Sequence, residues 1–113
     1  MEPNSVVTTA TIALDAEAVP DAQSIEGQPR TGARALTDFA GLEVGVWEMT
    51  PGTMTDVEAE ELFVVLSGSA TVEFADATPT LRLGPGDVVR LAAGAETVWT
   101  VTDTLRKVYL TRG

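Results

Sequence analysis

Glu61 and Lys107 are the residues of this chain best suited to acid–base chemistry, because the sequence has neither histidine nor cysteine. Those two absences remove the commonest general base, the commonest metal ligand and the thiol nucleophile from consideration. Glu61 opens an apolar stretch, so it is either a carboxylate directed into a cavity or a solvated charge at a strand end. Lys107 shares a strand face with Tyr109, and that face lines a pocket or lies at the surface. A lysine beside a carboxylate would carry protons or bind a substrate carboxylate.

Aromatic and polar side chains that could border the same cavity are spread along the sequence. Trp47 and Trp99 are either core residues or an apolar wall for a small planar ligand. Phe63 lies two residues after the carboxylate that opens its strand, so the two side chains share a face. Glu48 and Thr97 are weaker candidates for this cavity.

The elements that must position these residues are predicted to be β-strands. Residues 61–74 predict a strand, a Ser-Gly turn and a second strand. With roughly seven or eight short strands and no helical periodicity, the pattern is typical of a sandwich or a barrel. Further strands are predicted at residues 42–50, 81–83, 88–91, 97–101 and 105–110.

The N-terminal third of the chain differs from the rest in composition. Val6–Leu14 is rich in β-branched residues and predicts an edge or arm strand. Residues 15–34 mix proline and glycine with polar residues, which predicts a long irregular connector. Such a connector is unusual inside a compact domain, and wrapping over one face of a barrel would account for it.

Composition excludes several classes of partner. The net charge of −10 and the pI near 4.1 argue against nucleic acid and against an anionic membrane surface. No apolar run approaches the ~20 residues that a membrane span needs. The first residues lack the basic and apolar regions of a secretory signal, so a cytoplasmic location is expected.

Several motifs taken together resemble those of the cupins, which are small jelly-roll barrels, and most closely the ureidoglycine-aminohydrolase-type cupin family. That family's pattern has Gly-x-Trp-x-x-Thr-Pro-Gly, then an acidic pair before an apolar strand ending in Gly. Later come Gly-Asp, Pro-x-Gly-x-x-x-x-Trp and Arg-Lys-x-Tyr. The similarity covers about residues 25–112. The matching residues are Gly45, Trp47, Thr50, Pro51, Gly52, Glu60, Glu61, Gly68, Gly86, Asp87, Gly94, Trp99, Arg106, Lys107 and Tyr109.

This chain departs from the cupin motifs at their histidines. Only Glu61 remains of the usual metal site of three histidines and one carboxylate, so that site cannot form and neither a metal nor another cofactor is expected. The acidic run 58–60 is typical of a solvated loop; it could bind Ca²⁺ or Mg²⁺ through oxygen atoms, but it has too few carboxylates to predict a site. The histidine positions hold Thr55 and Val57 in one register, Glu58 and Glu60 in the other, and Thr97 in the second motif.

The resemblance implies an all-β fold, a single cupin jelly-roll β-barrel (double-stranded β-helix) over residues 25–113, with residues 1–24 as an N-terminal arm. It also implies a small molecule bound in the barrel interior. The alternative is a metal-independent enzyme acting on a small nitrogen-containing or carboxylate metabolite, similar to ureidoglycine aminohydrolases or ethanolamine-utilisation proteins, with Glu61 and Lys107 as the catalytic acid–base pair. The implied binding residues are Trp47, Glu48, Phe63, Thr97, Trp99 and Tyr109.

The outer surface of the barrel points to a third possibility, an interaction domain. Both faces of Leu62–Leu66 are apolar, so something must cover the outer face. A second subunit or the segment Val6–Leu14 could do so. Cupins of this kind are often homodimers, and we expect a homodimer here.

Overall fold

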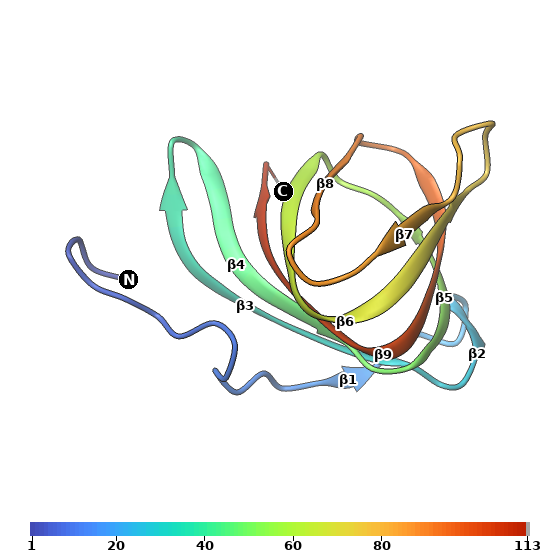
Figure 1. Cartoon of the computed structure of the whole chain (residues 1–113), viewed down its shortest axis with the longest axis horizontal. Helices are drawn as coiled ribbons and strands as arrows, with labels where there is room; N and C mark the ends of the chain where they lie inside the picture. The colour runs from blue at the N-terminus through green and yellow to red at the C-terminus, as the bar shows by residue number, and fades with distance from the viewer. Residues whose placement is uncertain (113) are drawn as a thin grey trace.

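Nine β-strands join in one sheet that curls into a barrel (Figure 1), in a computed structural model that describes residues 1–112. These residues contain no helix, and so none that could cross a membrane. The all-β prediction is therefore confirmed. The strands are β1 (Glu17–Ala18), β2 (Ser24–Glu26), β3 (Arg30–Phe39), β4 (Leu42–Met49), β5 (Gly52–Val57), β6 (Glu61–Phe74), β7 (Leu81–Leu83), β8 (Val88–Leu91) and β9 (Glu96–Thr111).

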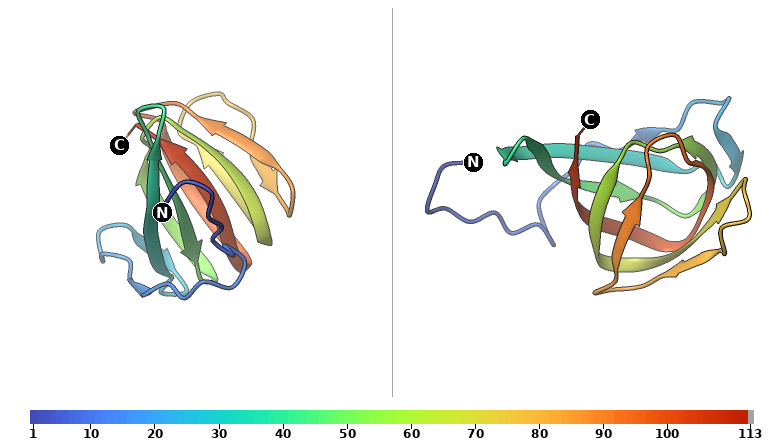
Figure 2. Two further views of the ribbon diagram at one scale, coloured as in Figure 1. Left: turned by 90° about the vertical axis from the view of Figure 1, so that its left-hand side faces the viewer. Right: turned by 90° about the horizontal axis from the view of Figure 1, so that it is seen from above.

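The two longest strands, β6 and β9, are the frame of the barrel. They pair antiparallel from Glu61–Thr111 at one end to Phe74–Thr97 at the other. β9 also pairs with β4 and with β5, while β6 also pairs with β7 and β8. Seen from above, in the right-hand view of Figure 2, these strands curve round a common interior. The hairpin of β3 and β4 extends beyond the barrel on the side of the N-terminus (Figure 1).

β6 bends sharply at Gly68 without ending. Its φ is +90°, a conformation that favours glycine, and a Cβ there would collide with the backbone of Thr104 and Leu105. The register with β9 shifts on both sides of this bend, as expected for a bulge. The prediction that residues 61–74 form a strand, a turn and a second strand is wrong, because both halves pair with β9 and not with each other.

The same long-range pairing corrects other boundaries. Residues 97–101 and 105–110, predicted as two strands, belong to the single strand β9, whereas the predicted β4, β7 and β8 are confirmed. The region 15–34, predicted as irregular, contains β1 and β2, which pair with β3 and β5. These two strands are only two and three residues long, too short to show a periodicity.

The N-terminal segment is an arm without a strand. Val6–Leu14 contains turns and no strand, so the predicted arm strand is wrong. The segment is held instead by Arg106, whose Nη1 donates to the carbonyl oxygens of Thr9 (2.9 Å) and Ile12 (2.7 Å). The predicted division between arm and barrel at residue 24 stays a prediction.

The core lies inside the curled sheet, where the inward side chains of β4, β5, β6, β7, β8 and β9 meet. Alternate residues of each strand point inward, as the period of two requires. The inward side chains are mostly aliphatic, and the largest is Trp99, which is 1% exposed. The core includes Met49, Met54, Phe63, Val65, Val72, Leu83, Leu91, Trp99, Val101 and Leu105.

Candidate functional site

Lys107, the only lysine in the sequence, lies inside the barrel and meets Glu61. Its Nζ atom, on β9, is 2.5 Å from Oε2 of Glu61 at the start of β6. The exposed fraction is 5% for the lysine side chain and 15% for the glutamate side chain. Removing two charges from water is costly, so such a pair is stable only with close contact and further favourable neighbours.

Three aromatic rings supply those neighbours. Nζ of Lys107 lies 4.1 Å from the ring centroid of Phe63, 4.5 Å from that of Trp47 and 5.0 Å from that of Trp99. All three distances are within the ~6 Å range of cation–π attraction. The rings also pack on one another, with centroids 5.6 Å apart for the two tryptophans and 5.9 Å for Phe63 and Trp99. We call Trp47, Phe63 and Trp99 the aromatic cage.

Glu58 is a site residue that the sequence reasoning missed. It was expected in a solvated loop, but it is only 8% exposed. Its Oε2 atom accepts hydrogen bonds from Oγ1 of Thr97 (2.6 Å) and from Nε1 of Trp99 (2.9 Å). Glu58 therefore fixes the orientation of one wall of the aromatic cage. Its coincidence with a histidine position in one register of the cupin motif was the available signal.

Tyr109 extends the site along β9. Its hydroxyl donates to Oε2 of Glu43 at 2.8 Å, across the pairing of β9 with β4. Burial raises the pKa of Tyr109 to about 12, helped by the hydrogen bond to the Glu43 carboxylate, which the phenolate would lose. Tyr109 is therefore a hydrogen-bond donor, not a base, at neutral pH.

Asp56 is a second residue that the sequence did not reveal. Burial raises its pKa above the usual range, and the neighbouring carboxylate of Glu58 adds to this. The amide of Val57, which donates to Oδ1 at 2.8 Å, and the ammonium of Lys107 act in the opposite direction. The protonated form of Asp56 is therefore more favoured than that of an exposed aspartate.

These side chains surround a cavity of about 240 Å³, which we call the inner cavity. Its polar lining is mostly acidic: four carboxylates face one ammonium. Because the ammonium is already paired with Glu61, the potential in the cavity is negative. The lining includes Glu43, Trp47, Asp56, Glu58, Glu61, Trp99, Lys107 and Tyr109.

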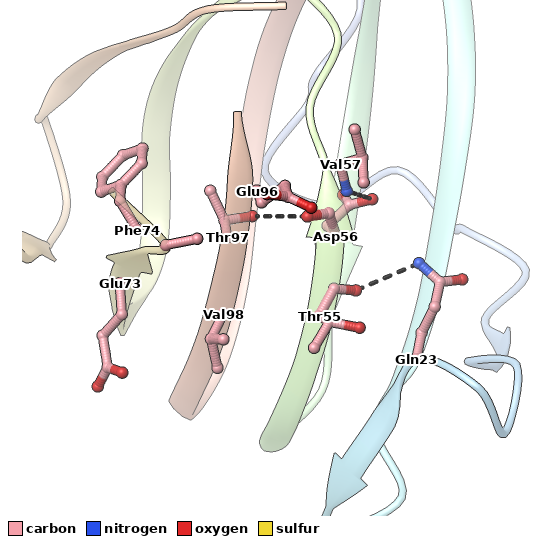
Figure 3. Close-up of a pocket in the computed structure, with 10 residues that line it drawn as sticks. Gln23, Thr55, Asp56, Val57, Glu73, Phe74, Glu96, Thr97 and Val98 are labelled. Atoms are coloured by element: carbon pink, nitrogen blue, oxygen red, sulfur yellow. Dashed lines mark hydrogen bonds between the residues drawn. The ribbon is translucent and has the colours of Figure 1, made fainter. Parts of the chain in front are cut away.

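A larger cavity of about 430 Å³ lies where β5, β9 and the end of β6 meet the loop that carries Gln23 (Figure 3). Nε2 of Gln23 donates to the carbonyl oxygen of Thr55 at 3.2 Å, and Oγ1 of Thr97 donates to that of Asp56 at 3.4 Å. This outer cavity contains neither the buried ion pair nor the tryptophans. We place the candidate site in the inner cavity, because the buried ion pair and Tyr109 lie there, whereas Asp56 lines both cavities.

The structure brings most of the predicted residues together. Trp47, Trp99 and Tyr109 line the inner cavity with Glu61 and Lys107. Phe63 is fully buried, with its ring against the ammonium group of Lys107. Thr97 does not line the inner cavity, but its hydroxyl is bonded to Glu58, which does. Their role in binding or catalysis stays a prediction.

Glu48 is not part of this cavity, so that prediction is wrong. Successive residues of β4 point to opposite faces, and Trp47 points inward. Oε1 of Glu48 accepts from Nε of Arg106 at 3.2 Å, on the outer face of the sheet. Because the same arginine holds the N-terminal arm, Glu48 helps to fasten the arm to the barrel.

The donor set does not fit the transition-metal site that the cupin resemblance implies. Imidazole ligands are absent from the sequence, and the retained carboxylate of Glu61 is bonded to Lys107. Within residues 1–112, no three acidic side chains are arranged to hold a metal ion. The position beside Glu61 is taken by an organic cation of the chain itself.

Comparison with known proteins identifies the family. The model of the EutQ-like cupin domain matches residues 39–109. Among solved structures, the EutQ protein of Clostridium difficile superposes with a TM-score of 0.71 at 15% identity, over 94% of this chain and 84% of that one. A putative ethanolamine utilisation protein Q of Salmonella typhimurium LT2 gives 0.63 at 19% identity, over 73% and 68%.

A protein of unknown function from Pseudomonas syringae pv. tomato DC3000 is more similar in sequence. It superposes with a TM-score of 0.73 at 27% identity, over 88% of this chain, which spans 44% of that protein. No curated protein matches the chain. The family match covers more than half of the sequence and agrees with the curled all-β sheet, so this chain belongs to the EutQ-like cupin family.

Proposed function

We propose that the inner cavity binds a small molecule, and that this ligand presents nitrogen-bound hydrogens rather than a carboxylate. The observation that carries the proposal is the convergence of four carboxylates on a cavity whose ammonium is already paired. The volume of about 240 Å³ is below the ~300–1,000 Å³ typical of drug-sized ligands. A small metabolite fits this space.

The charge of the cavity favours one of the two ligand classes that the sequence left open. A ligand carboxylate would enter beside Asp56, Glu58 and Glu43, where like charge is costly. An amine, amide or urea would donate to these oxygens and offset the burial and the repulsion by Glu58 that raise the pKa of Asp56. The tryptophans would pack against the ligand's apolar part.

Thermal unfolding with matched compounds tests this proposal. Small amines, amides and ureas should raise the Tm in a saturable manner, while carboxylates of equal size should not. Glu43→Gln, in the inner cavity, should weaken the effect. Glu73→Gln makes the same change in the outer cavity and should leave it intact. Stabilisation by carboxylates, or sensitivity only to Glu73→Gln, would contradict the proposal.

The second candidate is a metal-independent enzyme, and one observation favours it. Glu61 and Lys107 are close enough to exchange a proton, and both line the inner cavity. The reaction would be of the ureidoglycine-aminohydrolase or ethanolamine-utilisation type that the resemblance suggested. For any compound that stabilises the wild type, product formation is measured beside binding. Turnover that Glu61→Gln abolishes while binding survives supports the enzyme; binding without turnover supports the binding module.

A further inference from the structure

The ammonium group of Lys107 has the surroundings of a bound ligand. One N–H reaches Glu61 at 2.5 Å, and three ring centroids lie 4.1 to 5.0 Å from the nitrogen. The residue is 4% exposed, so these groups have replaced water around the charge. One carboxylate and several ring faces are the elements that recognise an alkylammonium ion.

The walls of this site are held by contacts that do not involve Lys107. The indole N–H of Trp99 is bonded to Glu58 at 2.9 Å, and Phe63 and Trp99 are at most 1% exposed. Trp47 packs against Trp99 with ring centroids 5.6 Å apart. The aromatic cage should therefore keep its shape when the lysine side chain is removed.

We infer that Trp47, Phe63, Trp99 and Glu61 form a binding site for a primary alkylammonium ion, which the chain fills with its own Lys107 side chain. A tethered occupant has a high effective concentration, so a free amine should not displace it. Lys107 thus supplies a permanent internal cation. This site shares Trp47, Trp99 and Glu61 with the lining of the inner cavity, and the ligand proposed there would bind beside the filled site.

Removing the occupant provides the test. Lys107→Ala vacates the site, and methylammonium is titrated while the Tm is recorded. We expect a rise of about 5 °C, relative to the same titration of wild type, at a concentration tenfold above the dissociation constant. Lys107→Met fills the space without charge and should show no such gain. Sodium chloride at the same concentration carries no alkylammonium group and should give no rise in Lys107→Ala.

Each contrary outcome overturns the inference in a recognisable way. An equal rise in wild type would place methylammonium in the inner cavity, beside a filled cage. An equal response of Lys107→Met, or to sodium chloride, would show a nonspecific salt effect. The absence of any gain in folded Lys107→Ala would show that the rings do not hold an ammonium ion.

A second measurement uses the wild type and does not depend on the folding of a variant. Because the chain has one lysine, protein labelled with ¹³C and ¹⁵N lysine shows a single side-chain spin system. Because Nζ lies 4.1 to 5.0 Å from three ring centroids, the protons on the adjoining carbon should be shifted upfield of those of an exposed lysine. Trp47→Leu removes one wall and should move them partly back. Resonances at the exposed position in wild type would overturn the inference.

Discussion

At the scale of single residues, the Glu61–Lys107 pair makes the clearest energetic prediction. Glu61→Gln and Lys107→Met should each lower the free energy of unfolding by about 3 kcal/mol, because each leaves a buried charge without its partner. The glutamate keeps some exposure, which places the cost at the lower end for buried pairs. Urea unfolding of both variants and of the double variant measures this.

The double variant is the control for this prediction. Removing both charges leaves no unpaired ion, so its loss of stability should be clearly smaller than the sum of the two single losses. Additive losses would mean that the two groups do not interact strongly in solution.

Tyr109 is the only tyrosine in the sequence, so the deprotonation of its hydroxyl can be followed by absorbance. Its absorbance titration should have a midpoint of about 12 in the folded protein, against 10.0 for an ordinary tyrosine. Between these values the unfolded chain binds fewer protons than the folded chain, so stability falls as pH rises. The contribution is fully present below pH 10 and lost through pH 12. Tyr109→Phe should not show this fall, and a midpoint near 10 would contradict the burial of the hydroxyl.

Removing the charge of Asp56 should stabilise the protein, whereas removing either charge of the Glu61–Lys107 pair should destabilise it. Its raised pKa means that the folded state prefers the protonated carboxyl, a contribution present below pH 3.8 and lost as pH rises through the folded pKa. Asp56→Asn should therefore stabilise the protein at neutral pH, and the gain should shrink in acid. A site residue that lowers stability is expected where function requires it. Destabilisation at neutral pH would contradict the unfavourable burial of this carboxylate and its repulsion by Glu58.

At the scale of elements, the close approach of β4 to β9 positions the tyrosine. A Cβ on Gly45 would collide with the hydroxyl of Tyr109 and lie 2.7 Å from the carbonyl oxygen of Arg34. Gly45→Ala should cost about 2–3 kcal/mol and lower the pKa of Tyr109 toward its ordinary value, because the ring must move away from Glu43. Unfolding and the absorbance titration measure both effects.

Gly84→Ala is the matched control on another part of the barrel. A Cβ at Gly84 would have no neighbour closer than 3.9 Å, and no positive φ is required there. It should change stability by no more than about 0.5 kcal/mol. If both alanine variants behave alike, the packing of Gly45 against Tyr109 is not what positions the ring.

At the scale of the whole molecule, the outer face of β6 and β8 remains partly open. Leu62 is 42% exposed and Val88 is 65% exposed, on neighbouring strands. We propose that a second copy covers this face. A stable dimer interface buries roughly 1,000 Å² or more, and an apolar patch of this kind would form part of it. Sedimentation at micromolar concentration should show a dimer that Val88→Glu converts to a monomer. Val57→Glu, equally exposed elsewhere, should remain dimeric. A monomeric wild type would contradict the proposal.

Local pattern predicted much of the fold but not its long-range pairing. β4, β7 and β8 were recognised because alternation and flanking turns are short-range signals. β6 was read as two strands because Gly68 and its serine neighbours have the composition of a turn. Only the partner strand distinguishes a turn from a bulge, and β9 lies more than 20 residues further along the chain.

The candidate site, like the fold, could be predicted only in part from the sequence. The sequence by itself excluded imidazole ligands and identified Glu61 and Lys107 as its acid–base candidates, since residue types do not depend on the fold. Only the tertiary structure decided that these two residues, 46 positions apart, meet at 2.5 Å, that Glu58 is buried and that Glu48 is not in the cavity. The reason is physical: the contacts form between β6 and β9 and inside a curled sheet, where pairing register and burial are set by the whole sheet.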